Sequence, residues 1–313
     1  MAEKKRRRTF RHWFQAAWFA LTNGYVLGFL EGKIYRGKLK SVCVPGLNCY
    51  SCPGALGACP IGSLQAVLDS GTFKFSCYVF GFLILFGTCL GRFICGWLCP
   101  FGLVQDLLHK APLFKKRKNL PGHRWLVWLK YVVLALFVLI LPATVAVTVT
   151  GMGEPWFCKY LCPSGTLFGG LPLIGANPGL RAAAGALFRW KLAILLAVVI
   201  LSVKYYRPFC KYLCPLGAVY GCFNPIALYR LRVDEEKCVK CSACQKACGM
   251  DIPVWEKPNS VECIRCGDCR AACPTGAIET TAERWRRKIR RLLRVRVPEK
   301  ELFFCGNMII KYR

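Results

Sequence analysis

Apolar residues along the chain gather into long runs that are separated by short polar or basic stretches. The runs cover about Trp13–Leu30, Phe75–Ile94, Trp125–Val149 and Ala186–Val203. A helix needs about 20 mostly apolar residues to cross a hydrocarbon core, so each run predicts a membrane span. The first is the weakest, because Gln15, Thr22 and Asn23 lie inside it. A tilted or interfacial helix is the alternative reading of that run.

Positive charge lies beside these runs. The chain has 313 residues, 55% of them hydrophobic, and carries 45 Lys and Arg against 16 Asp and Glu. Its basic stretches "EKKRRRTFR" and "HKAPLFKKRKNLPGHR" and its arginine-rich C-terminal region all fall on one side of the expected spans. The positive-inside rule makes that side the cytoplasm. We therefore expect a multi-pass protein of a bacterial or archaeal cytoplasmic membrane with both termini cytoplasmic, and no nucleic-acid partner.

A short cysteine motif, C-P-x-G, recurs in the first 230 residues. Its copies begin at Cys59, Cys99, Cys162 and Cys214, and the last three extend to C-x3-C-P. Each copy follows one expected span and precedes the next element, so successive copies alternate between the membrane faces. The chain then reads as two parallel halves, each with a span, an outer motif, a second span and an inner motif.

The clearest chemical signal is "CVKCSACQKAC" followed by "CIRCGDCRAACP", two copies of C-x2-C-x2-C-x3-C. This spacing binds cubane iron–sulfur clusters, and the fourth cysteine of each run ligates the other cluster. The spacing therefore predicts two [4Fe–4S] clusters, one on Cys238, Cys241, Cys244 and Cys273, the other on Cys263, Cys266, Cys269 and Cys248. Structural zinc, which needs two separated cysteine pairs, fits this pattern poorly.

A second candidate site joins two C-x3-C-P pairs that the expected topology places on the cytoplasmic side. The pairs are Cys95 with Cys99 and Cys210 with Cys214. Residues four apart on a helix are neighbours, so the two pairs could close a four-thiolate site. Such a site holds [4Fe–4S], [2Fe–2S] or mononuclear iron, and we favour the cubane cluster.

The outer side offers more cysteines than one cluster needs. The repeat predicts that the ligands of a further cluster there are Cys52, Cys59, Cys158 and Cys162. Cys49 is a possible substitute, and Cys43 is either a spare or part of a disulfide with Cys49.

These patterns predict an all-α polytopic membrane domain of about four transmembrane helices and two parallel repeats, followed by an α+β ferredoxin-like domain with two [4Fe–4S] clusters. We place the membrane domain at residues 1–230, the bacterial-type ferredoxin domain at 231–280, and a basic amphipathic segment at 281–313. The last contains "ERWRRKIRRLLRVRV". Such a helix suits anionic headgroups of the lipid bilayer or an acidic electron-transfer partner.

The spans joined by C-x3-C-P motifs, with "CPLGAVYGCFNPIALYRLRVDEEKC" leading into a two-cluster ferredoxin, resemble the NapH/NosR-type membrane polyferredoxins. In that family the positions matching Cys95, Cys99, Cys210 and Cys214 are the characteristic membrane motifs. The resemblance implies that the C-terminal clusters pass electrons between a membrane donor and a partner. The chain departs from the family in its outer cysteine-rich loop and third C-x3-C-P, and it shows no D-x-x-[ST]-G-A-[TS] flavin-attachment site.

The expected function is electron transfer, as a component of an oxidoreductase system and not as a stand-alone enzyme. A soluble ferredoxin or flavoprotein reductase would donate electrons to the C-terminal clusters. The membrane-domain clusters would pass them to an extracytoplasmic flavoprotein or reductase, or to quinone. Two alternatives stay open: a quinol-oxidising subunit that runs in the opposite direction, and an iron–sulfur assembly or regulatory factor for a partner reductase.

Overall fold

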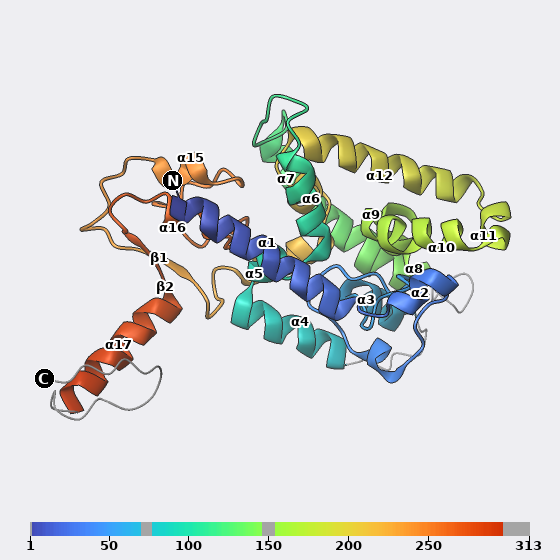
Figure 1. The fold of residues 1–313 in the computed structure, drawn as a ribbon, viewed down its shortest axis with the longest axis horizontal. Coiled ribbons are helices and arrows are strands. Elements are labelled where there is room, and N and C mark those ends of the chain that lie inside the picture. The colour runs from blue at the N-terminus through green and yellow to red at the C-terminus, as the bar shows by residue number, and fades with distance from the viewer. Residues whose placement is uncertain (1, 70–76, 146–153, 297–313) are drawn as a thin grey trace, which may run out of the picture.

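A computed structural model describes residues 2–69, 77–145 and 154–296 of the chain. The described chain is mostly helical, and Figure 1 shows two regions. A helical body holds the elements up to α14. A smaller unit with little regular structure follows it, and a long C-terminal helix projects away from both.

The N-terminal part of the body contains α1 (Ala2–Thr22), α2 (Val26–Glu31), a 3-10 turn (Lys38–Ser41), α3 (Pro60–Asp69), α4 (Cys77–Leu90), α5 (Phe93–Trp97) and α6 (Pro100–Lys110). Its remainder contains α7 (His123–Val133), a π-helical stretch (Leu134–Ile140), α8 (Leu141–Val145), a π-helical turn (Phe157–Leu161), α9 (Pro163–Gly165), a second such turn (Thr166–Gly170), α10 (Leu171–Ala176), α11 (Pro178–Ala182), α12 (Ala186–Lys204), α13 (Pro208–Tyr212) and α14 (Pro215–Phe223).

The C-terminal unit is built around two short antiparallel strands, β1 (Leu231–Val233) and β2 (Ile278–Thr280), in which Leu231 pairs with Thr280. Between them lie two short helices that pack on each other, α15 (Ala243–Ala247) and α16 (Asp268–Ala271). The strands thus bracket the segment that carries both ferredoxin motifs. The basic helix α17 (Thr281–Arg296) starts directly after β2 and extends into solvent (Figure 1).

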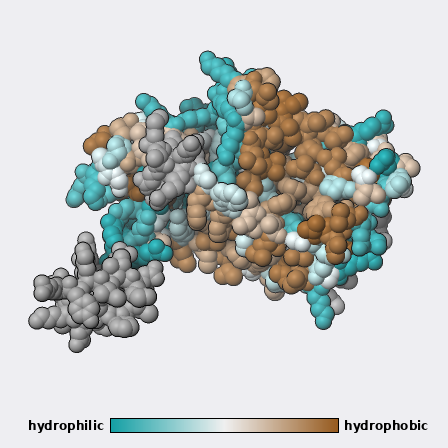
Figure 2. Space-filling model, viewed as in Figure 1, coloured by the Kyte–Doolittle hydropathy of each residue, from teal (hydrophilic) through white to brown (hydrophobic). Residues whose placement is uncertain are grey.

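Two helical stretches are long and apolar enough to cross a membrane, His123–Thr144 and Ala186–Lys204, each with about a fifth (22%) of its most apolar window buried. Their outward side chains are large and apolar: Trp125 is 85% exposed and Ile200 is 62% exposed. Core helices of soluble proteins bury such residues. Figure 2 shows a broad apolar face on the helical body. We therefore describe these two stretches as candidate membrane helices.

The other two expected spans differ from the prediction. The segment Trp13–Leu30 is divided between α1 and α2, since the side chains of Thr22 and Asn23 bond back to carbonyl oxygens of the preceding turn. Moreover, α1 packs on α6 and α16 and buries Arg11. It does not qualify by composition as a span.

Within Phe75–Ile94, the described helix α4 has 14 residues. It ends where Gly91 takes a left-handed conformation and its N–H bonds to the carbonyl of Gly87. The described part of α4 is about 21 Å long at 1.5 Å per residue, and it begins at the edge of residues 70–76, which lie outside the described residues. Phe75 and the outer end of the expected span Trp125–Val149 lie outside the described residues.

Candidate iron–sulfur sites

The C-P-x-G motif has the same local structure at each copy in the helical body. Its proline begins a helix (α3, α6, α9 or α14), where the fixed φ of proline and its missing N–H suit the first position. The thiol of the preceding cysteine accepts a hydrogen bond from the N–H of the motif's glycine, as Cys162 does from Gly165 and Cys214 from Gly217, both at 3.4 Å. The same contact lies at Cys59 and Cys99.

The glycine of the motif also allows other chain segments to come close. A Cβ on Gly165 would lie 3.5 Å from the Cys49 sulfur, and a Cβ on Gly102 would lie 3.2 Å from a guanidinium nitrogen of Arg207. The motif therefore joins a helix start, a thiol at that start, and a close approach between two chain segments.

Cysteine side chains gather in four sets of four. The first ferredoxin set is Cys238, Cys241, Cys244 and Cys273, which line one small hollow together with Trp255 and Ile278. The second ferredoxin set is Cys248, Cys263, Cys266 and Cys269; burial, and then the other three thiols, raise the pKa of Cys269 far above its ordinary value. Both sets are those that the C-x2-C-x2-C-x3-C spacing groups together.

The two ferredoxin loops wrap their sets in the same way. Lys240 and Arg265, which stand just before the second cysteine of each run, both have a positive φ, as do Ser242 and Gly267 just after it. Left-handed backbone is costly for residues other than glycine. Its repetition at matching positions indicates a loop shaped to turn three thiols toward one point.

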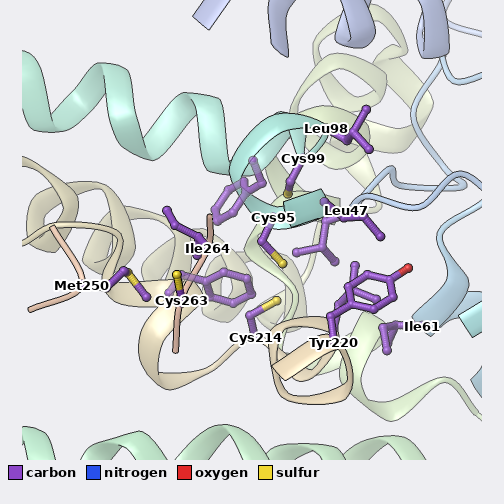
Figure 3. Close-up of a cluster of buried hydrophobic side chains, with 14 of the residues drawn as sticks. Leu47, Ile61, Cys95, Leu98, Cys99, Cys214, Tyr220, Met250, Cys263 and Ile264 are labelled. Atoms are coloured by element: carbon purple, nitrogen blue, oxygen red, sulfur yellow. The ribbon is translucent and has the colours of Figure 1, made fainter. Parts of the chain in front are cut away.

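The inner set is Cys95, Cys99, Cys210 and Cys214. Burial, and then the thiols of the other three members, raise the pKa of Cys214 well above its ordinary value. All four side chains are buried. In Figure 3 the sulfurs of Cys95 and Cys214 point toward each other across the core. The structure thus brings together the two C-x3-C-P pairs that the repeat groups.

Two buried arginines clamp the inner set reciprocally. Arg92, three residues before Cys95, donates to the carbonyl oxygen of Cys210 at 3.0 Å. Arg207, three residues before Cys210, donates to the carbonyl oxygen of Cys95 at 2.7 Å. Each motif therefore fixes the backbone of the other.

The basic side chains around the inner set outnumber the carboxylates that pair with them. Arg92 and Lys130 share Glu262, while Arg207 and Arg11 share Asp106. Although burial opposes ionisation, Arg207 and Arg11 hold the pKa of Asp106 below its usual value. Four cations thus face two carboxylates. An oxidised [4Fe–4S] cluster with four thiolates carries about two negative charges, which would offset that surplus, so the donor set and its surroundings fit such a group.

The outer set is Cys49, Cys59, Cys158 and Cys162. Burial raises the pKa of Cys59 to about 12, and the neighbouring thiols of Cys162 and Cys49 add to the effect. Burial likewise raises the pKa of Cys158, with Cys162, Cys59 and Cys49 as its neighbours. Lys191 donates to the carbonyl oxygen of Cys158 at 3.1 Å, so a cation also contacts this set.

The structure places Cys49, not Cys52, with the other members of the outer set. The Cys52 thiol instead faces the turn after α1, where it donates to the side-chain oxygen of Asn23 at 3.6 Å. Cys43 contacts Ser63 at 3.5 Å. Cys43 and Cys49 are both free thiols in the structure. Cys305 lies outside the described residues.

A tetrahedral ion with metal–sulfur bonds of about 2.3 Å draws its four sulfurs to within about 3.8 Å of each other. Among the described residues, no three His, Cys, Asp or Glu side chains form a group fit for one metal ion. The cysteine spacing of the two ferredoxin runs is that of [4Fe–4S] clusters. When bound, a [4Fe–4S] cluster supplies one-electron redox chemistry.

Several side chains that build these sites were missed by sequence reasoning. Gln65 and Gln105 each contact a cysteine of the opposing motif, and Arg92 and Arg207 clamp the inner set. Their positions relative to the motifs could have pointed to them. Both glutamines stand six residues after the cysteine of C-P-x-G, and both arginines stand three residues before the first cysteine of C-x3-C-P.

Together, these thiol sets define an iron–sulfur protein with candidate membrane helices. A family model described as a 4Fe-4S binding domain matches residues 75–121, 133–180, 190–232 and 269–292, just over half of the chain. A second model with the same description matches residues 257–279. The chain belongs to this family of 4Fe-4S binding domains.

Among curated proteins, the chain is similar to ferredoxin-type relatives. An uncharacterized protein of Methanocaldococcus jannaschii is 33% identical over 201 residues, 61% of this chain and 65% of the relative. The provisionally named electron transport protein YccM of Escherichia coli is 28% identical over 55% of this chain and 45% of its own.

The ferredoxin-type protein NapH of Haemophilus influenzae is 28% identical over 53% of this chain and 50% of its own. The chain thus spans less than two thirds of the relatives named here. No solved structure matches it. The matches support a ferredoxin-type iron–sulfur protein of electron transport.

Proposed function

We propose that this protein is a membrane-bound electron conduit. In this proposal each of the four thiol sets holds a [4Fe–4S] cluster. Electrons enter from a cytoplasmic ferredoxin or reductase at the first ferredoxin set and leave through the outer set to an acceptor at or beyond the membrane. The names of the relatives, an electron transport protein and a ferredoxin-type protein, agree with such a role.

The observation that carries the proposal is that the segments carrying the second ferredoxin set, the inner set and the outer set contact one another. The loop of the second ferredoxin set lies against the inner motif so closely that a Cβ on Gly96 would be 2.3 Å from the carbonyl oxygen of Ile264. The indole N–H of Trp97 also donates to the carbonyl oxygen of Arg265 at 3.1 Å. Figure 3 shows Cys263 and Ile264 beside Cys95.

A second bridge joins the inner and outer sets. The backbone N–H of Leu47, in the loop that carries Cys49, bonds to the Cys99 thiol. Tyr220 is fully buried, lies near both Cys95 and Cys59, and donates to the carbonyl oxygen of Pro45 at 3.2 Å. A hydrocarbon core of about 30 Å would be too wide for one fast hop. Contacts of this kind support shorter steps between sets.

The first ferredoxin set suits an entry point for electrons. Cys241 is exposed and Cys238 and Cys273 are partly exposed, whereas the inner set is buried. The net charge of +29 would attract an acidic soluble donor. In this proposal the protein is multi-pass with both termini in the cytoplasm.

One feature favours a second candidate function, quinol oxidation with electrons moving inward. A largely apolar cavity of about 930 Å³ adjoins the outer set and is also lined by Asp69 and Tyr78. Its volume lies within the range of small-molecule pockets, although part of it is the space that the outer set itself surrounds. A quinol could release its protons toward the carboxyl group of Asp69.

Iron counting and turnover test the proposal. Purified protein in detergent should contain about sixteen iron and sixteen acid-labile sulfide per chain, four of each per cubane cluster. About eight would mean that only the ferredoxin sets are filled. In vesicles, reduced ferredoxin on the side of the C-terminus should be discharged by an acceptor on the other side. Failure of this transfer together with failure of quinol oxidation contradicts both directions of electron flow.

A further inference from the structure

Two buried glutamines occupy matching places in the inner and outer sets. Gln65 lies on α3, six residues after Cys59, and Gln105 lies on α6, six residues after Cys99. Both side chains are fully buried, at 0% exposure. Burying an amide is costly unless its donors and acceptors are satisfied, so the partners of these amides explain why they are there.

The partners are the same in both places. The Gln105 side-chain nitrogen donates to the Cys210 sulfur at 3.1 Å, and its oxygen accepts from the backbone N–H of Phe209 at 3.2 Å. The Gln65 nitrogen donates to the Cys158 sulfur at 3.3 Å, and its oxygen accepts from the N–H of Phe157 at 2.9 Å. Each glutamine therefore reaches from one motif to the first cysteine of the opposing C-x3-C-P.

The second hydrogen on each amide nitrogen is also used. Gln105 donates to the carbonyl oxygen of Phe101 at 3.4 Å, and Gln65 to that of Ile61 at 3.2 Å, each one turn earlier on its own helix. This bond fixes the amide so that its remaining N–H is directed at the sulfur. The backbone N–H of the phenylalanine needs only the side-chain oxygen of the glutamine as its acceptor. It does not explain why the glutamine also donates an N–H to the cysteine sulfur.

A donor to a ligand sulfur has a known consequence for an iron–sulfur cluster. Reduction adds negative charge that spreads onto the thiolate sulfurs, and an N–H directed at one of them stabilises the reduced form. Hydrogen bonds to sulfur are among the features that set cluster potentials. In a buried site with few competing waters, such a bond acts more strongly than at the surface.

We propose that Gln105 and Gln65 are matched positioning residues that raise the reduction potentials of the clusters on the inner and outer sets, respectively. The inference rests on the proposed function, since it requires that both sets hold clusters. It adds that the two membrane-domain sites are tuned by the same contact, so that electrons pass between sites of related potential.

Two substitutions at each position separate this role from packing and from charge. Gln105→Met and Gln65→Met are neutral and of similar length but have no N–H for the sulfur. Gln105→Glu and Gln65→Glu keep an oxygen acceptor for the phenylalanine N–H and also lose the amide donor. The measurements are iron per chain and the midpoint potential of each cluster signal, from EPR-monitored redox titration of the full chain in detergent.

We expect each variant to keep about sixteen iron per chain and to move one EPR signal to a more negative midpoint potential. The Gln105 variants should move one signal and the Gln65 variants a different one, and the Gln65→Met/Gln105→Met double variant should move both. The remaining signals should stay as in the wild type.

Other outcomes would overturn the proposal. If the variants keep their iron and their midpoint potentials are unchanged, the N–H bonds to sulfur do not set the potentials. If the midpoint potential shifts only in the Glu variants, the added charge causes the shift and not the loss of the N–H bond. Loss of iron in both the Met and the Glu variants shows that the amides only hold the sites together. If the wild type itself holds about eight iron, the membrane-domain clusters of the proposed function are absent and the failure lies there.

Discussion

Replacing Gly96 by alanine tests the contact through which we propose that electrons pass from the ferredoxin unit to the inner set. The new Cβ would lie 2.3 Å from the carbonyl oxygen of Ile264, where ordinary contact begins at 3.4 Å. The obstacle is backbone and cannot rotate away. The ferredoxin loop must therefore retreat by about 1 Å, and relieving such overpacking costs about 1–3 kcal/mol.

That cost predicts that the ferredoxin loop packs less often against the inner motif. An energy of about 1–3 kcal/mol changes an equilibrium about 5- to 150-fold, and electron tunnelling slows steeply with distance. Gly96→Ala should therefore slow transfer from the ferredoxin clusters to the inner site, as measured by rapid-freeze EPR after mixing with a reduced low-potential donor. Iron content, measured in parallel, separates slower transfer from loss of a cluster.

Gly175→Ala is the matched control. Gly175 lies on a short helix, and a Cβ there meets nothing within 4 Å. The control should transfer electrons at the wild-type rate. If Gly96→Ala also keeps the wild-type rate and the wild-type unfolding temperature, the ferredoxin loop does not pack on the inner motif, and the reasoning that joins these two sets fails.

Three further changes test other parts of the structure. Cys49→Ser should lower the iron content by about four per chain while Cys52→Ser leaves it unchanged; the reverse result would restore the sequence-based choice of Cys52. Asp106→Asn leaves Arg207 and Arg11 buried without their shared carboxylate, which should cost about 3–5 kcal/mol of stability in detergent thermal melts. Asp234→Asn, which breaks the more exposed pair with Lys237, should cost less than about 1 kcal/mol, and equal losses would contradict the argument. Stripping iron with a chelator should lower the unfolding temperature, because the cluster binds the folded chain only. An unchanged unfolding temperature would mean that bound clusters do not stabilise the folded chain.

Local cysteine spacing groups thiols that the structure also brings together where they lie close in sequence. The two ferredoxin sets follow from C-x2-C-x2-C-x3-C because such a short loop can place its thiols in few ways. The inner set follows from two copies of one motif. The outer set was harder, since Cys49 and Cys52 are three residues apart and only the folded loop shows which of them turns toward Cys59.

The ends of the helices were harder to predict than the grouping of the cysteines. The apolar run Trp13–Leu30 does not show that the chain divides there between α1 and α2, nor that α1 packs on α6 and α16 and buries Arg11. The end of α4 depends on the conformation of Gly91, one residue in a long apolar run. Asp106 and Glu262 each form buried ion pairs with residues about a hundred or more positions away in the sequence. No local sequence pattern predicts such partners.

The reciprocal arginines also have a consequence for biogenesis. Cys95 and Arg207 are separated by 112 positions, so a ribosome completes one half of the inner site long before the other half exists. Arg92 additionally bonds to Glu262 in the ferredoxin unit at 2.8 Å, which is made later still. The inner site can therefore close only after its second cysteine pair has been made, and the contact with Glu262 forms later still. If the inner set holds the proposed cluster, all four of its ligands exist only after that point, so its assembly follows synthesis of both motifs.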